Sequence, residues 1–108
     1  MTLSADMPLS EKRLVYRAAV QRSLEVFYAK TSVESQRLVR DWWKRISETA
    51  AFRSGLFMHQ EPINTAVRIA HLNAVEITSS NEEAYEQLLD ACRAHTSEQR
   101  SMGVSAGA

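Results

Sequence analysis

Three residues near the middle of the chain, His59, Glu61 and His71, are of the types that bind Zn²⁺ or transfer protons. His59 and Glu61 precede Pro62, whereas His71 falls well inside the apolar segment that follows. In a helix that begins at Pro62, the rise per residue places His71 about 14 Å from the helix start. No HExxH pairing occurs. We therefore expect no metal, cofactor or catalysis, and an enzyme with a groove site at these three residues is the second alternative.

Cys92, the only cysteine of the chain, is a candidate nucleophile. A reactive thiol needs a neighbour that lowers its pKa, but Cys92 lies on the apolar face of a predicted helix, so we expect a buried, unreactive thiol. A single cysteine excludes an internal disulfide framework. No glycine-rich phosphate-binding loop, signal-like apolar run or stretch of 18 apolar residues occurs. These observations predict a cytoplasmic protein without a membrane span.

The charges are unevenly distributed along a chain whose net charge is zero. Residues 11–53 contain ten Lys and Arg against five Asp and Glu, a net of +5, whereas residues 54–108 carry a net of −4. Such an asymmetry bears on association rather than on the fold. The two halves could attract each other within one chain or between chains, and the basic half could also meet an anionic partner.

The basic residues Arg37, Arg40 and Lys44 recur at helical spacing and share one predicted helix face. Clustered cations can bind the phosphates of nucleic acid, which makes a nucleic-acid-binding helical domain the first alternative function. Asp41 interrupts this face, and pairs of Asp41 with Arg37 or Arg45 would explain it as a solvated surface. The overall neutral charge also weakens the nucleic-acid hypothesis.

Hydrophobic periodicity predicts an all-α domain, a small bundle of about four helices. The 108 residues fit one domain, and three Gly and two Pro are too few for a many-turned β-sandwich. We expect disordered ends at residues 1–9 and 97–108 around a single helical domain at 10–96. The first helix is expected from an N-cap at Ser10 to about Lys30, with apolar residues on two adjacent strips.

Local signals mark where the later helices begin. Thr31 and Glu34 fit a capping box that opens a second helix, which ends between Ser47 and Ser54 and carries Ala50 on its inner face. Pro62 suits the first turn of a third helix, expected to run to about Ile77 after a proline-marked elbow. A fourth helix follows residues 78–81 with an inner face of Ala84, Tyr85, Leu88, Leu89, Ala91 and Cys92 and an outer face of Glu82, Glu83, Glu86 and Asp90.

The first and third predicted helices carry more apolar surface than one packing face needs. We therefore expect a small regulatory or protein–protein interaction protein that forms a homodimer or docks on another protein. Trp and Arg are enriched at interface hot spots. The predicted partner-binding residues lie on the basic helix and around the elbow, which we define as residues 55–62: Trp43, Arg40, His59, Glu61, Asn64, Arg68 and His71.

Overall fold

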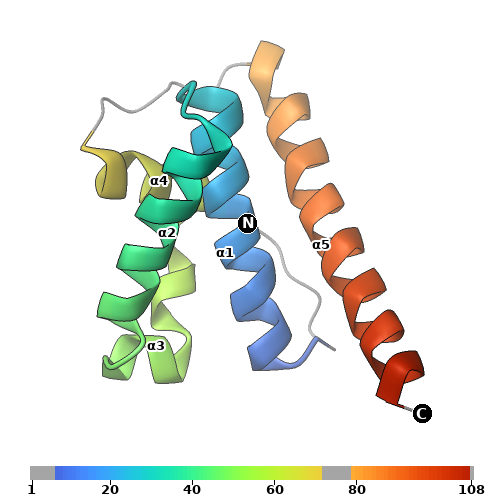
Figure 1. Cartoon of the computed structure of the whole chain (residues 1–108). Coiled ribbons are helices and arrows are strands. Elements are labelled where there is room, and N and C mark those ends of the chain that lie inside the picture. Colours follow the sequence, from blue (N-terminus) through green and yellow to red (C-terminus); the bar gives the residue numbers. More distant parts are fainter. Residues whose placement is uncertain (1–6, 72–78, 108) are drawn as a thin grey trace.

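The computed structural model describes residues 7–71 and 79–107 and is all-helical over them, as predicted (Figure 1). Side chains are described for residues 7–71 and 81–95. The helices are α1 (Leu9–Phe27), α2 (Ser32–Ile46), α3 (Ala50–Ser54), the 3₁₀ helix η1 (Leu56–His59), α4 (Pro62–Ala70) and α5 (Ser79–Gly107). Among the described helices, none combines the length and the apolar character that a membrane span requires.

Helix α1 lies at the centre of the molecule and is buried on two sides. One strip, which includes Tyr16 and Leu24, packs with α2 and α4, and the other, which includes Val15 and Ala19, packs with α4 and α5. The two predicted strips are thus both covered within one chain. The predicted N-cap at Ser10 is wrong, because the helix begins at Leu9 behind Pro8. It also ends at Phe27 rather than near Lys30.

The predicted second helix is two helices. Thr31 caps α2 as predicted, since its Oγ1 accepts from the Glu34 N–H at 3.1 Å. However, α2 ends at Ile46, and Thr49 caps the short helix α3 in the same way by accepting from the Phe52 N–H at 3.1 Å. Ala50 therefore opens α3 as an exposed residue and does not face inward on α2.

The elbow turns the chain back toward α2. Gly55 ends α3 with a left-handed φ of 82°, a conformation that glycine adopts without steric penalty. Pro62 then stands in the first turn of α4, as predicted. The expected continuation to Ile77 is wrong in its first part: α4 ends at Ala70, and His71 caps it with a φ of 55°. Residues 72–78 of that prediction lie outside the described residues.

Helix α5 packs against α1 through the predicted apolar face. Tyr85, Leu88, Leu89 and Cys92 are buried, whereas Ala84 and Ala91 are exposed. The acidic residues of the predicted outer face are all exposed. Although the sequence predicts a disordered tail at 97–108, the backbone of α5 is helical to Gly107. In Figure 1, α5 lies on one side of α1, and α2, α3 and α4 lie on the other.

Candidate binding groove

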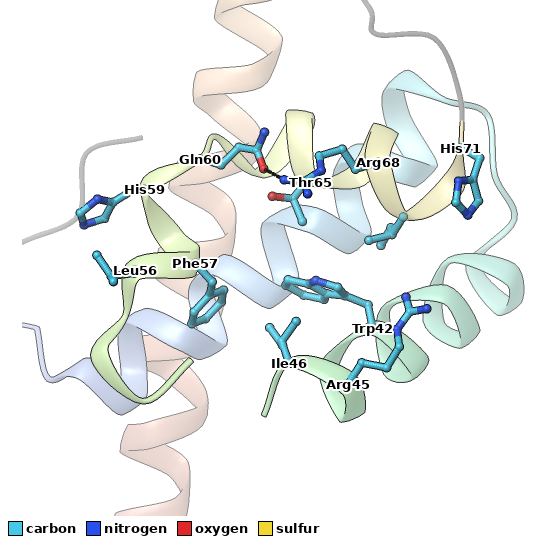
Figure 2. Close-up of a pocket in the computed structure, with 11 residues that line it drawn as sticks. Trp42, Arg45, Ile46, Leu56, Phe57, His59, Gln60, Thr65, Arg68 and His71 are labelled. Atoms are coloured by element: carbon cyan, nitrogen blue, oxygen red, sulfur yellow. Dashed lines mark hydrogen bonds between the residues drawn. The ribbon is translucent and has the colours of Figure 1, made fainter. Parts of the chain in front are cut away.

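An open cavity of about 710 Å³ lies between α2, η1 and α4 (Figure 2). It forms there because α3 and η1 are short and the Gly55 turn brings the chain back, so that α4 faces α2 across the cavity. The cavity and its lining side chains are called the binding groove below. Its lining residues are Trp42, Arg45, Ile46, Leu56, Phe57, His59, Gln60, Thr65, Arg68, Ile69 and His71.

The floor of the binding groove is aromatic and aliphatic. Trp42 is buried, and its ring lies edge-on to Phe57 with centroids 6.1 Å apart. Phe57 in turn contacts the ring of Tyr16 edge-on at 5.3 Å. Such contacts hold the rings in place beyond the effect of their burial. The floor is therefore a rigid apolar surface on which a ligand could bury its own apolar groups.

The rim of the binding groove is cationic. Arg45 projects from α2 and Arg68 from α4, and the Arg68 Nη1 donates to Gln60 Oε1 at 2.8 Å (Figure 2). His59 and His71 stand at opposite ends in Figure 2. The eleven lining residues include these four basic side chains and no Asp or Glu. This arrangement suits a ligand that combines carboxylates or other anionic groups with apolar surface.

The elbow wall is fixed by Tyr16 from α1. The Tyr16 hydroxyl donates to the Gln60 carbonyl at 2.7 Å and lies 2.6 Å from Thr65 Oγ1. Because its single proton goes to Gln60, the Thr65 hydroxyl donates to Tyr16. Burial raises the pKa of Tyr16 to about 12, although the hydrogen bond to Thr65 opposes that shift. Two residues that line the binding groove are thus anchored to the central helix.

Glu61 is held from the opposite side, by α5. The Tyr85 hydroxyl donates to Glu61 Oε2 at 2.8 Å, and the Ile63 N–H donates to the Tyr85 oxygen at 3.4 Å. Desolvation by burial raises the pKa of Tyr85. Glu61 therefore engages α5 and is not among the residues that line the binding groove. Its carboxylate is a structural link between α4 and α5.

The structure brings together only part of the predicted acid–base cluster. His59 and His71 line the same groove but at its two ends, and Glu61 is turned toward α5. Over residues 7–71 and 79–107, no group of three or more His, Cys, Asp and Glu side chains could hold a metal ion. Glu61 is thus turned away from the two histidines, and the three predicted groups do not converge on one point of the groove.

The predicted partner-binding residues divide between the groove and other positions. His59, Arg68 and His71 line the groove, whereas Asn64 and Arg40 are exposed outside it. Arg40 pairs with the neighbouring Asp41 at 3.9 Å. That exposed pair involves a different arginine from the predicted Arg37 and Arg45. The three residues of the nucleic-acid hypothesis, Arg37, Arg40 and Lys44, are all exposed on α2.

Trp43 is half-buried in contacts within the chain. Its ring lies edge-on to Phe52 at 5.0 Å and to Phe57 at 5.9 Å, and the Arg17 guanidinium lies 5.1 Å from its centroid. Phe52 also stacks on Phe57 with centroids 5.3 Å apart. Trp43 therefore joins α1, α2 and α3 behind the groove floor, and only its exposed part is available to a partner.

A smaller cavity, of about 470 Å³, lies between α1 and α5 beside Cys92. Cys92 is buried as predicted, at 5% exposure. Desolvation by this burial raises the pKa of its thiol, which keeps the sulfur protonated. A protonated, buried thiol is a poor nucleophile.

Several groove residues were missed in the sequence because they belong to other patterns. Trp42 and Ile46 read as core positions of an amphipathic helix, and the structure shows that the core face continues into the groove floor. Arg45 was assigned to the solvated face of the same helix, in a predicted pair with Asp41, and not to a binding site. Gln60 and Thr65 carried no local signal, because their partner Tyr16 lies more than 40 residues away.

No protein-family model matches the chain, and neither a curated protein nor a solved structure is significantly similar to it.

Proposed function

We propose that this chain is a small cytoplasmic interaction protein, of a regulatory rather than a catalytic kind, that recognises an acidic, partly apolar segment of a partner protein in the binding groove. The observation that carries the proposal is the composition of the groove. Arg45, Arg68, His59 and His71 surround an aromatic and aliphatic floor, and no acidic residue is among the lining side chains.

The two kinds of lining supply different parts of recognition. Apolar surface buried on the floor contributes about 25 cal/mol per Å² to binding before the costs of association. The guanidinium of an arginine presents several N–H donors in a plane and can hold a carboxylate with two of them. Because Arg45 and Arg68 stand on different helices, a partner with suitably spaced carboxylates would be held in one register.

The groove is less suited to the enzymatic alternative. General acid–base catalysis needs a proton donor or acceptor within hydrogen-bond reach of the reacting atoms. The nearby carboxylate, Glu61, accepts from Tyr85 on the α5 side. The groove is also open to solvent rather than enclosed, which favours a segment of a partner protein over a small enclosed substrate.

Selection from a displayed library of helical peptides would test the proposal. Charged positions would be varied among acidic, basic and neutral residues, with apolar positions kept at helical spacing. We expect enrichment of acidic peptides and weaker binding by Arg45→Ala/Arg68→Ala, by about tenfold or more. The matched control is Arg37→Ala/Lys44→Ala, which removes two exposed cations of α2 outside the groove. Enrichment of neutral or basic peptides, or equal binding by the groove variant, would contradict the proposal.

A second candidate function is nucleic-acid binding, and it is favoured by the exposure of Arg37, Arg40 and Lys44 along α2. Phosphate contacts release counterions, so binding should weaken steeply with salt. Labelled single- and double-stranded oligonucleotides titrated at two salt concentrations would test it. In this case Arg37→Ala/Lys44→Ala should lose binding, while Arg45→Ala/Arg68→Ala keeps more of it. The two double variants thus separate the two functions.

A further inference from the structure

A second charged surface lies on α5, on the far side of the molecule from the binding groove. Its exposed acidic residues, called the acidic face below, are Glu82, Glu83, Glu86 and Asp90. An adjoining strip of α5, which includes Tyr85, Leu88 and Leu89, is buried against α1. The packing of α5 against α1 thus leaves the acidic face exposed to solvent.

The acidic face and the binding groove are complementary in charge but cannot meet within one chain. Helix α1 stands between α5 and α2 (Figure 1), and the start of α4 contacts α5 through Tyr85, on the buried side of α5. The elbow is also tied to both sides, by Tyr16 to α1 and by Tyr85 to α5. Contact between the two surfaces therefore requires two molecules.

We propose that the groove of one molecule receives the acidic face of α5 from a second copy of this chain. This inference rests on the proposed function and names the partner. Along a helix, Glu82 and Asp90 are about 12 Å apart, so several carboxylates lie within one short stretch. Because Asp90 already pairs with Arg93, the contacts with Arg45 and Arg68 are assigned to Glu82, Glu83 and Glu86.

The positions of the two surfaces determine the kind of assembly. A two-fold dimer uses the same patch on both subunits, whereas contact between two different patches is head-to-tail. Here the patches differ and lie on opposite sides of α1. Each added copy leaves one groove and one acidic face open. Such an association builds a ring or an open chain of copies and grows with protein concentration, in contrast to the homodimer that the sequence predicts.

Charge reversal on each surface separately provides the test. Arg45→Glu/Arg68→Glu removes the receiving groove, and Glu82→Lys/Glu86→Lys removes the inserted face. Sedimentation velocity of the wild type in low salt, after nuclease treatment, should show larger species as the protein concentration rises. Raising the salt from about 0.1 M to about 1 M shortens the Debye length from about 10 Å to about 3 Å. This screening should return the larger species to monomers.

Mixing the two charge-reversed variants is the decisive step. Each variant alone has one good surface and one reversed surface, so each should self-associate at least about tenfold more weakly than the wild type. In the mixture, the intact groove of the second variant meets the intact acidic face of the first. The reversed groove, now acidic, is likewise complementary in charge to the reversed α5 face, now basic. We therefore expect the mixture to regain the association that each variant alone has lost.

Three outcomes would overturn the inference. The first is a wild type that stays monomeric after nuclease treatment. The second is a mixture of the two variants that does not associate, although both variants keep their helical circular dichroism. The third is self-association of both variants at the wild-type level, which would place the interface elsewhere. Arg37→Glu/Lys44→Glu carries the same charge change as the groove variant and should associate like the wild type. If the groove still selects acidic peptides through Arg45 and Arg68, the proposed function stands without the second copy; if it selects none, both fail.

Discussion

The hydroxyl groups of Tyr16 and Thr65 lie 2.6 Å apart, and both residues are buried. Tyr16 belongs to the central helix, and Thr65 belongs to the first turn of α4, where it also lines the binding groove. The same tyrosine donates to the Gln60 carbonyl at 2.7 Å. One side chain thus fixes both the elbow and one wall of the groove, so the groove's shape depends on the interior of the bundle.

Tyr16→Phe should lower the free energy of unfolding by about 1–3 kcal/mol, because it leaves the Gln60 carbonyl and the Thr65 hydroxyl without this partner. Urea unfolding followed by circular dichroism would measure the loss. Thr65→Val should lower the free energy of unfolding less in the Tyr16→Phe background than in the wild type, since both changes remove the same hydrogen bond. Full additivity of the two losses would show that the residues are not coupled.

Stability should fall above pH 10 because of the same tyrosine. The pKa of Tyr16 is about 12 in the folded chain against an ordinary value of 10, chiefly through burial. Between these values the folded state keeps a proton that the unfolded chain releases, so raising the pH favours unfolding. The difference of two pKa units corresponds to about 2–3 kcal/mol of folding stability, which is present below pH 10 and lost by about pH 12. Burial raises the pKa of Tyr85 in the same direction.

Urea unfolding at a series of alkaline pH values would test this dependence. Tyr16→Phe should flatten the decline between pH 10 and 12 without abolishing it, because Tyr85 still contributes. Tyr28→Phe is the control, since Tyr28 is only half-buried and its hydroxyl donates to the Ile63 carbonyl at the longer distance of 3.3 Å. An equally steep decline in Tyr16→Phe would contradict the assignment to Tyr16.

The parts of the fold that local chemistry determines could be predicted. The Thr31 cap, the start of α4 at Pro62 and the buried faces of α1 and α5 follow from capping geometry and from apolar spacing. Thr49 also precedes an apolar helical stretch and could have indicated the start of α3. The continuous apolar pattern from Leu38 to Ala50 concealed that break.

The end of α4 and the groove depend on contacts that sequence spacing does not show. The apolar pattern continues past Ala70, yet His71 takes a left-handed conformation and its N–H bonds to the carbonyls of Arg68 and Val67. Non-glycine residues seldom adopt this conformation without support from the surrounding structure. The groove similarly needs Gln60 and Thr65 to meet Tyr16 across the fold. For this reason the elbow was recognised, whereas the opposing wall with Arg45 was not.

Gly55→Ala should lower the free energy of unfolding by about 1–2 kcal/mol. Gly55 has a φ of 82°, which an alanine adopts only with strain, and an added Cβ would approach Leu9 Cδ1 to 3.0 Å and Met58 Cε to 3.2 Å. Thermal unfolding by circular dichroism would measure the loss. Ala51→Ser, at an exposed position of α3, should change the stability by no more than about 0.5 kcal/mol. Equal stability of Gly55→Ala and the wild type would show that the turn relaxes.

Trp43→Glu should destabilise the chain by about 2–3 kcal/mol, less than the 3–5 kcal/mol typical of truncating a fully buried Trp. The change removes the ring contacts with Phe52 and Phe57 and the contact with the Arg17 guanidinium. Thermal unfolding and sedimentation of the same sample separate stability from association. Arg40→Ala, at an exposed residue of the same helix, is the control. Weaker association at unchanged stability would instead support the sequence-based prediction that Trp43 anchors a partner.

Cys92 should react slowly with iodoacetamide in the folded protein and at the ordinary rate in urea. The thiolate is the reactive form, and burial both raises the thiol pKa and blocks access to the sulfur at 5% exposure. Mass spectrometry of samples quenched over time would give both rates. Leu89→Ala opens a cavity beside the same apolar face and should speed labelling by increasing transient unfolding. Rapid labelling of the stable wild type would show that α5 separates from α1 readily. The acidic face would then not be held in a fixed position on the folded chain.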